Sequence, residues 1–112
     1  MVITFQMEGG VAHFPGLARP ITILDADLAP GELDELRGLI GAARFFDEPA
    51  ADPPGPAAVD AQRYVISIAE AGRSHTLRRH DPVGPPPLAD LVAYVRKKAI
   101  SVLRARAKPP VP

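Results

Sequence analysis

Two stretches in which large apolar residues recur at every second position constrain the fold of this chain most. They span residues 2–7 and 63–69. Every second residue in them is apolar: Ile3, Phe5, Met7, Tyr64, Ile66 and Ile68. A period of two residues is typical of a β-strand that buries one face and leaves the other open to solvent. The alternation therefore predicts two strands of a sheet with one covered face.

Two further strands are expected beside these. Residues 19–24 should pair with the first strand as a hairpin, with Pro20 at the strand start or on an edge because proline lacks a backbone N–H group. Residues 70–73 contain a glycine and predict a tight turn that leads into a strand over residues 74–80. This last strand is mostly polar, which is typical of the edge of a sheet.

Apolar residues recur at helical spacing in two other stretches. The first helix begins near Pro30 and carries Leu33, Leu36, Ile40 and Ala43; the second begins near Leu88 and carries Leu91, Val92, Val95, Ala99, Val102 and Leu103. The predicted order is ββαββα, an α+β fold in which a four-stranded, mainly antiparallel sheet packs against helices. The chain has 112 residues, which fits one domain, expected over residues 1–107, with residues 108–112 as a frayed tail.

Three connections are longer or more irregular than closing this fold requires. Residues 8–16 separate two paired strands for which a two-residue turn would suffice. Residues 47–60 hold four prolines, four acids and no basic residue, and residues 81–87 are also rich in proline. If the first helix returns the chain to the end of the sheet where residues 8–16 lie, all three connections meet there. The turn at Gly72 then lies at the opposite end, so the function is expected at the end with the long loops.

The adjacent glycines Gly9 and Gly10 have two interpretations. They supply positive φ angles in a wide turn, or they allow the backbone to approach a partner closely, with Glu8 and Phe14 presented alongside. Phe14 itself is either exposed or folded back into the core.

Composition and motifs exclude several classes of function. The 13 basic and 13 acidic residues leave no formal net charge, so no attraction of the whole molecule to nucleic acid or to a membrane is expected. The chain has no cysteine, which excludes a disulfide framework and a thiolate zinc site. Its three histidines lack metal-ligand spacing, and its serines lie in no nucleophile elbow. We therefore expect no enzymatic activity, no cofactor and no bound metal.

Location and assembly are predicted only in outline. There is no N-terminal signal-peptide pattern and no apolar run of about 18 residues that could cross a membrane, so a cytoplasmic protein is expected. A monomer is expected for the free protein, although the unmatched edge strand at residues 74–80 leaves dimerisation open.

The run from Arg96 to Lys108 holds six basic residues and no acid. It is either a solvated helix face whose charges suit the helix C-terminus, or a binding surface for an anionic partner. The second interpretation makes the protein a small interaction or regulatory module. Zero net charge and few aromatic residues argue against nucleic acid as that partner.

Several short motifs follow one another in a characteristic order. They are Gly9-Gly10 after the first strand, Ala42-Ala43-Arg44-Phe45-Phe46 at the end of the first helix, Arg63-Tyr64-Val65-Ile66-Ser67-Ile68, Gly72-Arg73-Ser74-His75-Thr76 and Pro86-Pro87-Leu88. In this order and spacing, residues 2–104 resemble the emfourin family, small bacterial inhibitors of protealysin-like proteases within the thermolysin-like zinc metallopeptidases. The resemblance implies a protein without enzymatic activity that plugs the zinc-containing cleft of a protease. It also implies a cystatin-like arrangement of helix and sheet.

Under this resemblance, the long loops are the candidate protease-binding segments. Residues 7–14 are expected to enter the cleft, and residues 47–54 to lie beside it. The predicted contact residues are Met7, Glu8, Gly9, Gly10, Val11, His13, Phe14, Asp47, Glu48 and Pro49. The carboxylate of Glu8 or of Asp47 is the candidate for contact with the protease zinc, since zinc accepts carboxylate oxygen. The expected partner is a thermolysin-like or protealysin-like metalloprotease.

Overall fold

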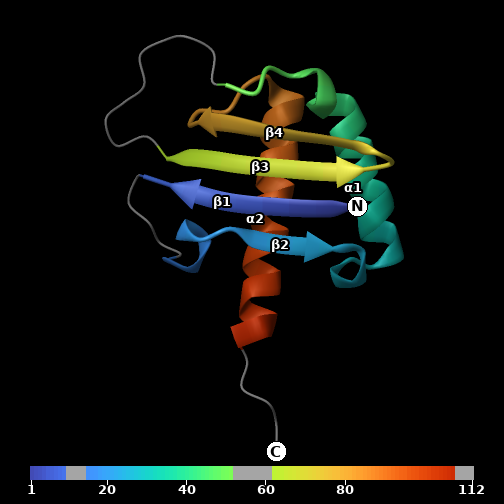
Figure 1. The fold of residues 1–112 in the computed structure, drawn as a ribbon, viewed down its shortest axis with the longest axis vertical. Coiled ribbons are helices and arrows are strands. Elements are labelled where there is room, and N and C mark those ends of the chain that lie inside the picture. Colours follow the sequence, from blue (N-terminus) through green and yellow to red (C-terminus); the bar gives the residue numbers. More distant parts are fainter. Residues whose placement is uncertain (10–14, 52–61, 108–112) are drawn as a thin grey trace, which may run out of the picture.

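The computed structural model describes residues 1–9, 15–51 and 62–107 (Figure 1). These residues form the strands and helices β1 (Val2–Glu8), β2 (Ile21–Leu24), α1 (Pro30–Ala43), β3 (Arg63–Glu70), β4 (Arg73–His80) and α2 (Pro86–Ala107). Short 3-10 turns connect some of them: η1 (Pro15–Ala18), η2 (Asp25–Asp27) and η3 (Phe45–Asp47). The predicted order ββαββα and the α+β class are therefore confirmed.

The four strands form one antiparallel sheet in the order β2-β1-β3-β4. Their register places Ile21, Phe5, Ile66 and Leu77 in one row across all four strands. None of these four side chains is more than 5% exposed. Removal of this apolar surface from water is the main favourable contribution to folding, so the row holds the sheet together from edge to edge.

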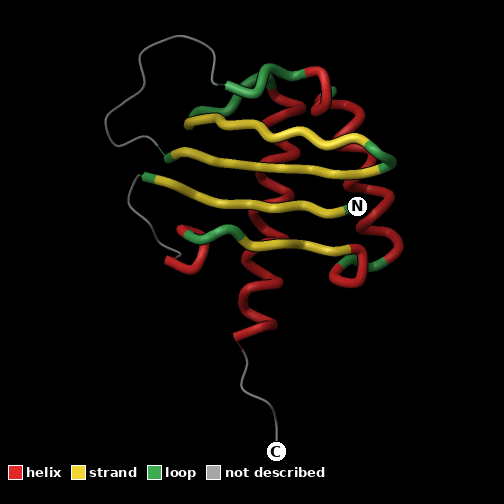
Figure 2. Tube along the Cα trace, in the orientation of Figure 1, coloured by secondary structure: helices red, strands yellow, loops and turns green. Residues whose placement is uncertain are grey.

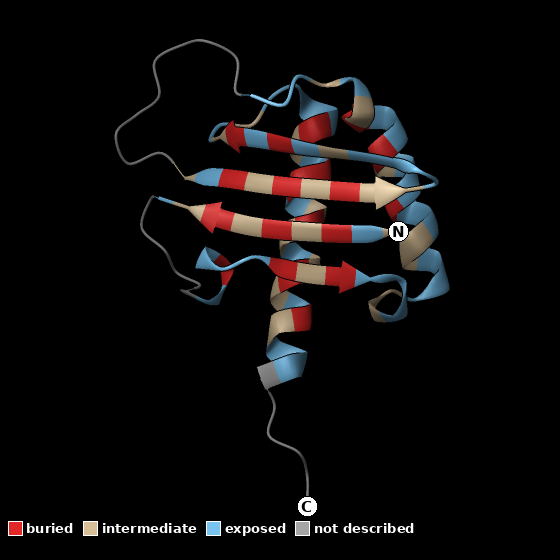
Figure 3. Ribbon diagram, viewed as in Figure 1, coloured by how far each residue is buried: buried red, intermediate tan, exposed pale blue. Residues whose placement is uncertain are grey.

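Both helices cover the same face of the sheet (Figures 1 and 2). Helix α2 crosses behind the strands, and α1 packs against α2 beside it. Buried and more exposed residues alternate along the strands, as the sequence pattern predicts (Figure 3). The stripe predicted for the second helix is buried at Leu88, Leu91, Val92, Val95, Ala99 and Val102. The opposite face of the sheet is open, and there Thr4 lies between Thr22 and Ser67.

The turn between β3 and β4 is as tight as predicted. It contains only Ala71 and Gly72, whose φ angles of 52° and 77° are both in the left-handed region. Two successive positive φ angles match the right-handed twist of the paired strands, which is why such turns close hairpins. Glycine adopts this conformation without strain, whereas Ala71 does so against its usual preference.

Two predicted element boundaries are displaced. Strand β2 begins at Ile21 and not at Arg19, because the η1 turn ends at Ala18 and Pro20 has no N–H group to give to a ladder. Helix α2 begins at Pro86, two residues before Leu88. Proline is tolerated in a first helical turn, where its missing N–H group would have no partner inside the helix.

The predicted path of the first helix is wrong. Helix α1 does not return the chain to the end of the sheet that carries the long loops, because Arg37 in its middle pairs with Glu70 at the opposite end (2.8 Å between Nε and Oε1). Beyond α1, the Phe46 ring lies 4.1 Å from the guanidinium of Arg73, at the start of β4. The segment Phe45–Ala51 then carries the chain along β4 towards the end with the long loops (Figure 1).

Candidate functional site

The end of the sheet that carries the long loops is tied together by one residue that precedes β3. The last register row there pairs Glu8 with Arg63, and Arg63 with His80. Gln62 donates from Nε2 to the backbone oxygen of Glu8 (3.0 Å) and accepts from the N–H of Asp81 at its own carbonyl (2.8 Å). The ends of β1, β3 and β4 therefore form a fixed platform, which we call the loop end of the sheet.

The first predicted binding segment leaves this platform at the end of β1. Met7 is 8% exposed and lies in the core, so its side chain is closed to a partner in the free protein. Glu8 is half-buried and Gly9 is exposed. Gly9 has a φ of 70°, which supports the interpretation that this glycine is needed for the backbone turn. The predicted contacts at Gly10, Val11, His13 and Phe14 lie outside the described residues.

The far side of the same loop is anchored to the helices. Leu17 in η1 is fully buried, and Gln6 donates from Nε2 to the carbonyl of Ala18 (2.8 Å). A Cβ atom at Gly16 would come within 2.6 Å of Leu103 in α2, so glycine allows this close approach. Both ends of the first loop are thus held by the core.

The second predicted binding segment runs beside the outer edge of β4. The carbonyl of Ala50 accepts from the N–H of Arg78 (2.9 Å), and the carbonyl of Glu48 lies 2.6 Å from Nε2 of His75. Asp47 and Pro49 are exposed, whereas the carboxylate of Glu48 lies 3.5 Å from the guanidinium of buried Arg79. The segment therefore lies along the outer edge of β4 between His75 and Arg78, where the sequence leaves dimerisation through an edge strand open.

The two predicted binding segments are not adjacent where the structure describes them. Strands β3 and β4 lie between β1 and residues 48–51. Because neighbouring strands are about 4.8 Å apart, the two segments are separated by roughly 14 Å. Both segments lie near the loop end of the sheet, but with two strands between them. The sequence analysis expected them side by side.

A shallow pocket of about 250 Å³ lies next to the loop end, lined by Tyr64, Asp81, Pro82, Val83, Val92 and Arg96 among others. The hydroxyl of Tyr64 donates to Oδ2 of Asp81 (2.9 Å), which ties β3 to the connection between β4 and α2. Burial raises the pKa of Tyr64, and the hydrogen bond to Asp81 raises it further, so this phenol stays protonated and donates.

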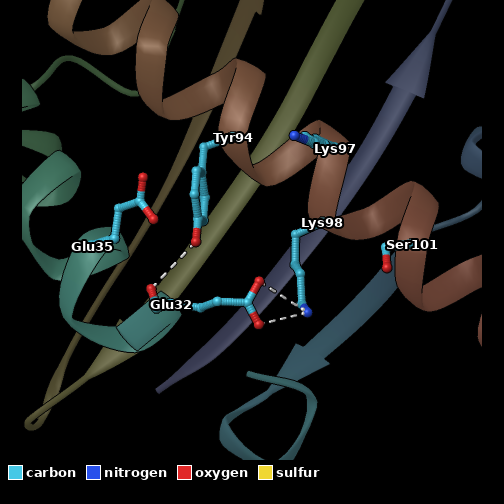
Figure 4. Close-up of a pocket in the computed structure, with 6 residues that line it drawn as sticks. All are labelled: Glu32, Glu35, Tyr94, Lys97, Lys98 and Ser101. Carbon is cyan, nitrogen blue, oxygen red and sulfur yellow. Dashed lines mark hydrogen bonds and ion pairs between the residues drawn. The ribbon is translucent and has the colours of Figure 1, made fainter. Parts of the chain in front are cut away.

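A second groove, of about 360 Å³, lies between the two helices (Figure 4). Glu32, Glu35, Tyr94, Lys97, Lys98 and Ser101 line it. Nζ of Lys98 lies 3.1 Å from Oε1 of Glu32, and the Tyr94 hydroxyl points to the Glu32 carbonyl (3.5 Å). The N–H of Ala29 and then Lys98 lower the pKa of Glu32, because both stabilise its charged form. The contacts in this groove join α1 to α2, away from the loop end of the sheet.

The basic run of α2 is partly neutralised by contacts within the chain. Lys98 pairs with Glu32, and Arg106 pairs with Asp27 (3.3 Å) and donates to the carbonyl of Thr22 (2.9 Å). These contacts favour the interpretation of the run as a packed and solvated helix face. The observed pairs weigh against a docking surface for an anionic partner.

Across residues 1–9, 15–51 and 62–107, no three His, Asp or Glu side chains gather into a set that could hold a metal ion. In the same part of the chain, neither helix combines the length and the apolar character needed to cross a membrane.

Sequence reasoning missed Arg79, Gln62 and His75, which hold the predicted binding segments in place. Gln62 and His75 act through bonds to backbone atoms far along the chain, which leave no local pattern. Arg79 did leave a signal. It occupies an inward-facing position two residues after Leu77, where the alternation of β4 calls for an apolar residue.

The fold and the loop end define a small α+β scaffold that carries two separately anchored loops. Comparison with protein-family models identifies it further. The chain belongs to the emfourin family, whose model, described as Emfourin, matches residues 5–96. A search of the curated proteins and a search of the solved structures returned no match. The family is known for inhibitors of protealysin-like metalloproteases, and membership implies an inhibitor rather than an enzyme.

Proposed function

We propose that this protein inhibits a thermolysin-like or protealysin-like zinc metalloprotease by covering the active-site cleft with the loop end of its sheet. The observation that carries the proposal is the pair of anchored segments, β1 to Gly9 and Glu48–Ala51, within a chain of the emfourin family. The matched region spans both segments.

A stiff frame under both segments favours tight binding. Association costs the free energy of ordering loops and side chains, and segments that are already ordered reduce this cost. Gln62 fixes the end of β1, and bonds to β4 fix residues 48–51. A protease–inhibitor interface buries about 800 Å² on each partner. Two segments roughly 14 Å apart are spaced widely enough to contact both sides of a cleft.

The segment from Glu8 onward is proposed to enter the cleft, with Asp47, Glu48 and Pro49 against its rim. Glu8 ends β1 and directly precedes the turn at Gly9, so its carboxylate is the first candidate for contact with the protease zinc. A carboxylate can replace the water on a catalytic zinc, because such zinc sites keep one open position. Asp47 is the second candidate for this contact.

The first experiment is a titration of the purified protein into a thermolysin-like and a protealysin-like protease, with peptide hydrolysis as the readout. Activity should fall linearly and reach zero near one equivalent if binding is tight. A serine protease serves as a control and should keep its full activity. If neither metalloprotease is inhibited by protein that circular dichroism shows to be folded, the proposal is wrong for both targets.

A further inference from the structure

Arg79 is a charged residue in a core position. It is 4% exposed and is the single polar or charged side chain among the buried residues that the structure describes. It shares the inward-facing side of β4 with Leu77, which is fully buried. A buried guanidinium is strongly unfavourable unless hydrogen bonds and an opposite charge compensate for the lost water.

The compensation comes almost entirely from the second predicted binding segment. Nη1 of Arg79 donates to the carbonyl of Ala51 (3.1 Å) and more weakly to that of Ala50 (3.4 Å). Nη2 donates to the carbonyl of Pro49 and lies 3.5 Å from Oε2 of Glu48. A further bond runs to the carbonyl of the neighbouring Arg78 (2.7 Å). One side chain therefore contacts four consecutive residues, from Glu48 to Ala51.

The composition of this segment explains why a side chain is needed there. Pro49 has no N–H group, so residues 48–51 cannot form a regular ladder with β4. The backbone bond between the described segment and β4 is that from Arg78 N–H to the Ala50 carbonyl. Guanidinium offers five N–H donors in a rigid plane, which suits several carbonyls at once. The ammonium of lysine is more compact and sits on a flexible stem, so it cannot reproduce this geometry.

We propose that Arg79 is a positioning residue of the inhibitor: its guanidinium holds Glu48–Ala51 against β4 and thereby fixes Asp47, Glu48 and Pro49 for binding to the protease. This inference rests on the proposed function. Without the guanidinium, residues 48–51 keep the contact of His75 with the Glu48 carbonyl and the bond from the Arg78 N–H to the Ala50 carbonyl, but lose the contacts that span all four residues. A released segment must then be ordered when the complex forms, which weakens inhibition. It also becomes a better substrate, since proteases cleave segments that open locally.

The test compares Arg79→Met, Arg79→Lys and Ile68→Ala with the wild-type protein. Methionine keeps an unbranched chain but removes every donor, and lysine keeps the charge without the planar fork. Ile68 is buried on the same face of the sheet and pairs with His75, nearer the Gly72 turn than Arg79 is. Its truncation is the control for a loss of stability that leaves the guanidinium of Arg79 in place. Hydrogen exchange at the Arg78 amide reports on the segment without any protease, because this amide is bonded to Ala50.

We expect Arg79→Met to raise the inhibition constant by about tenfold or more and to accelerate exchange at the Arg78 amide. Mass spectrometry should show that the target protease slowly cleaves this variant after Phe46 and before Arg63. Arg79→Lys should lie between the wild type and Arg79→Met in both measurements. Ile68→Ala should lower the unfolding temperature but leave the inhibition constant within about twofold at temperatures where it is folded.

The outcomes separate this inference from the proposed function. If wild-type protein does not inhibit, the proposed function fails, and the exchange measurement alone still shows whether Arg79 holds the segment. If wild-type protein inhibits and Arg79→Met releases the Arg78 amide without changing the inhibition constant, the positioning role is wrong. If Arg79→Met does not fold, Arg79→Lys decides: wild-type values for both inhibition and exchange would overturn the inference.

Discussion

The two ends of this sheet are built in opposite ways. At one end, β3 and β4 are joined by two residues, Ala71 and Gly72, and the adjacent Glu70 pairs with Arg37 of α1. At the other end, the strands lead into connections far longer than a hairpin needs, and Gln62 ties the strand ends together from outside the ladder. The β3–β4 hairpin is therefore closed by a minimal two-residue turn, whereas the connections at the other end are long. The connections at the loop end are longer than closing the strands requires, and binding is therefore proposed there.

The largest expected effect comes from a substitution in the core row that lies between the two ends of the sheet. Phe5 is fully buried at the centre of the sheet, in the row with Ile21 and Ile66. Phe5→Ala should lower the free energy of unfolding by about 3–5 kcal/mol, because it removes apolar contact and leaves a cavity. Chemical denaturation followed by circular dichroism measures this change.

Leu24 provides the control for this core substitution, since it is 45% exposed on the open face of the sheet. Leu24→Ala should change the free energy of unfolding by no more than about 0.5 kcal/mol. Similar losses for Phe5→Ala and Leu24→Ala would show that the row through Phe5 does not carry the stability of the sheet.

The next prediction separates the two ends by function. Glu8→Ala, at the loop end, should raise the inhibition constant by about tenfold to a hundredfold if its carboxylate contacts the protease zinc. Glu70→Ala removes an acid from the opposite end of the same sheet and should leave inhibition unchanged. Its effect on stability should stay below about 1 kcal/mol, because Arg37, its partner, is 51% exposed and water screens the pair.

Inhibition assays with both variants, at equal concentrations of folded protein, give the comparison. An unchanged inhibition constant for Glu8→Ala would exclude Glu8 as the zinc contact and move the test to Asp47→Ala. If Glu70→Ala weakens inhibition as much as Glu8→Ala does, the assignment of binding to the loop end is wrong.

A third prediction compares Gly72, in the turn between β3 and β4, with Gly38 in α1. Gly72 has a φ of 77°, so Gly72→Val should lower the free energy of unfolding by about 1–2 kcal/mol through backbone strain. Inhibition by the folded fraction should not change. A Cβ atom added at Gly38 in α1 would meet no other atom within 4 Å, so Gly38→Ala should instead stabilise the protein by about 0.5–1 kcal/mol. Thermal unfolding of the two variants would contradict this if both shifted in the same direction.

The extent to which the sequence predicts this molecule also differs between its regions. Inward-facing positions such as Ile3 and Ile66 were predictable, because side-chain direction in a strand follows a period of two residues. The stripe of α2 and the turn at Gly72 were predictable for similar local reasons. The path of residues 45–51 along β4 was not predictable. It depends on bonds from Arg79 and His75 to backbone atoms about 27 to 30 residues earlier in the chain. The candidate site depends on these distant contacts, so its segments were named from the sequence but their spacing was not.

The smallest expected effect lies away from both ends, in the groove between the helices. The N–H of Ala29 donates to Oε1 of Glu32 (3.0 Å), and Lys98 approaches the same carboxylate (3.1 Å). These contacts lower the pKa of Glu32 below its ordinary value of 4.5. A carboxyl group whose pKa is depressed by folding adds stability above its unfolded pKa, and this stability is lost as the pH falls through the folded pKa.

Wild-type protein should therefore lose stability from about pH 4.5 downward, and Glu32→Gln should lose less over the same range. At pH 7 the wild type should be the more stable of the two proteins, because the variant lacks its charged contacts, and this gap should narrow at low pH. The difference should be small, since Glu32 is exposed to solvent and salt screens its charge. Denaturant titrations of both proteins at pH 7 and pH 3 measure it, and inhibition assayed at pH 7 should not differ between them. A gap in stability that stays constant between the two pH values would show that the Glu32 carboxylate does not couple folding to protonation. The stability of the helix pair would then have to be assigned to its apolar contacts alone.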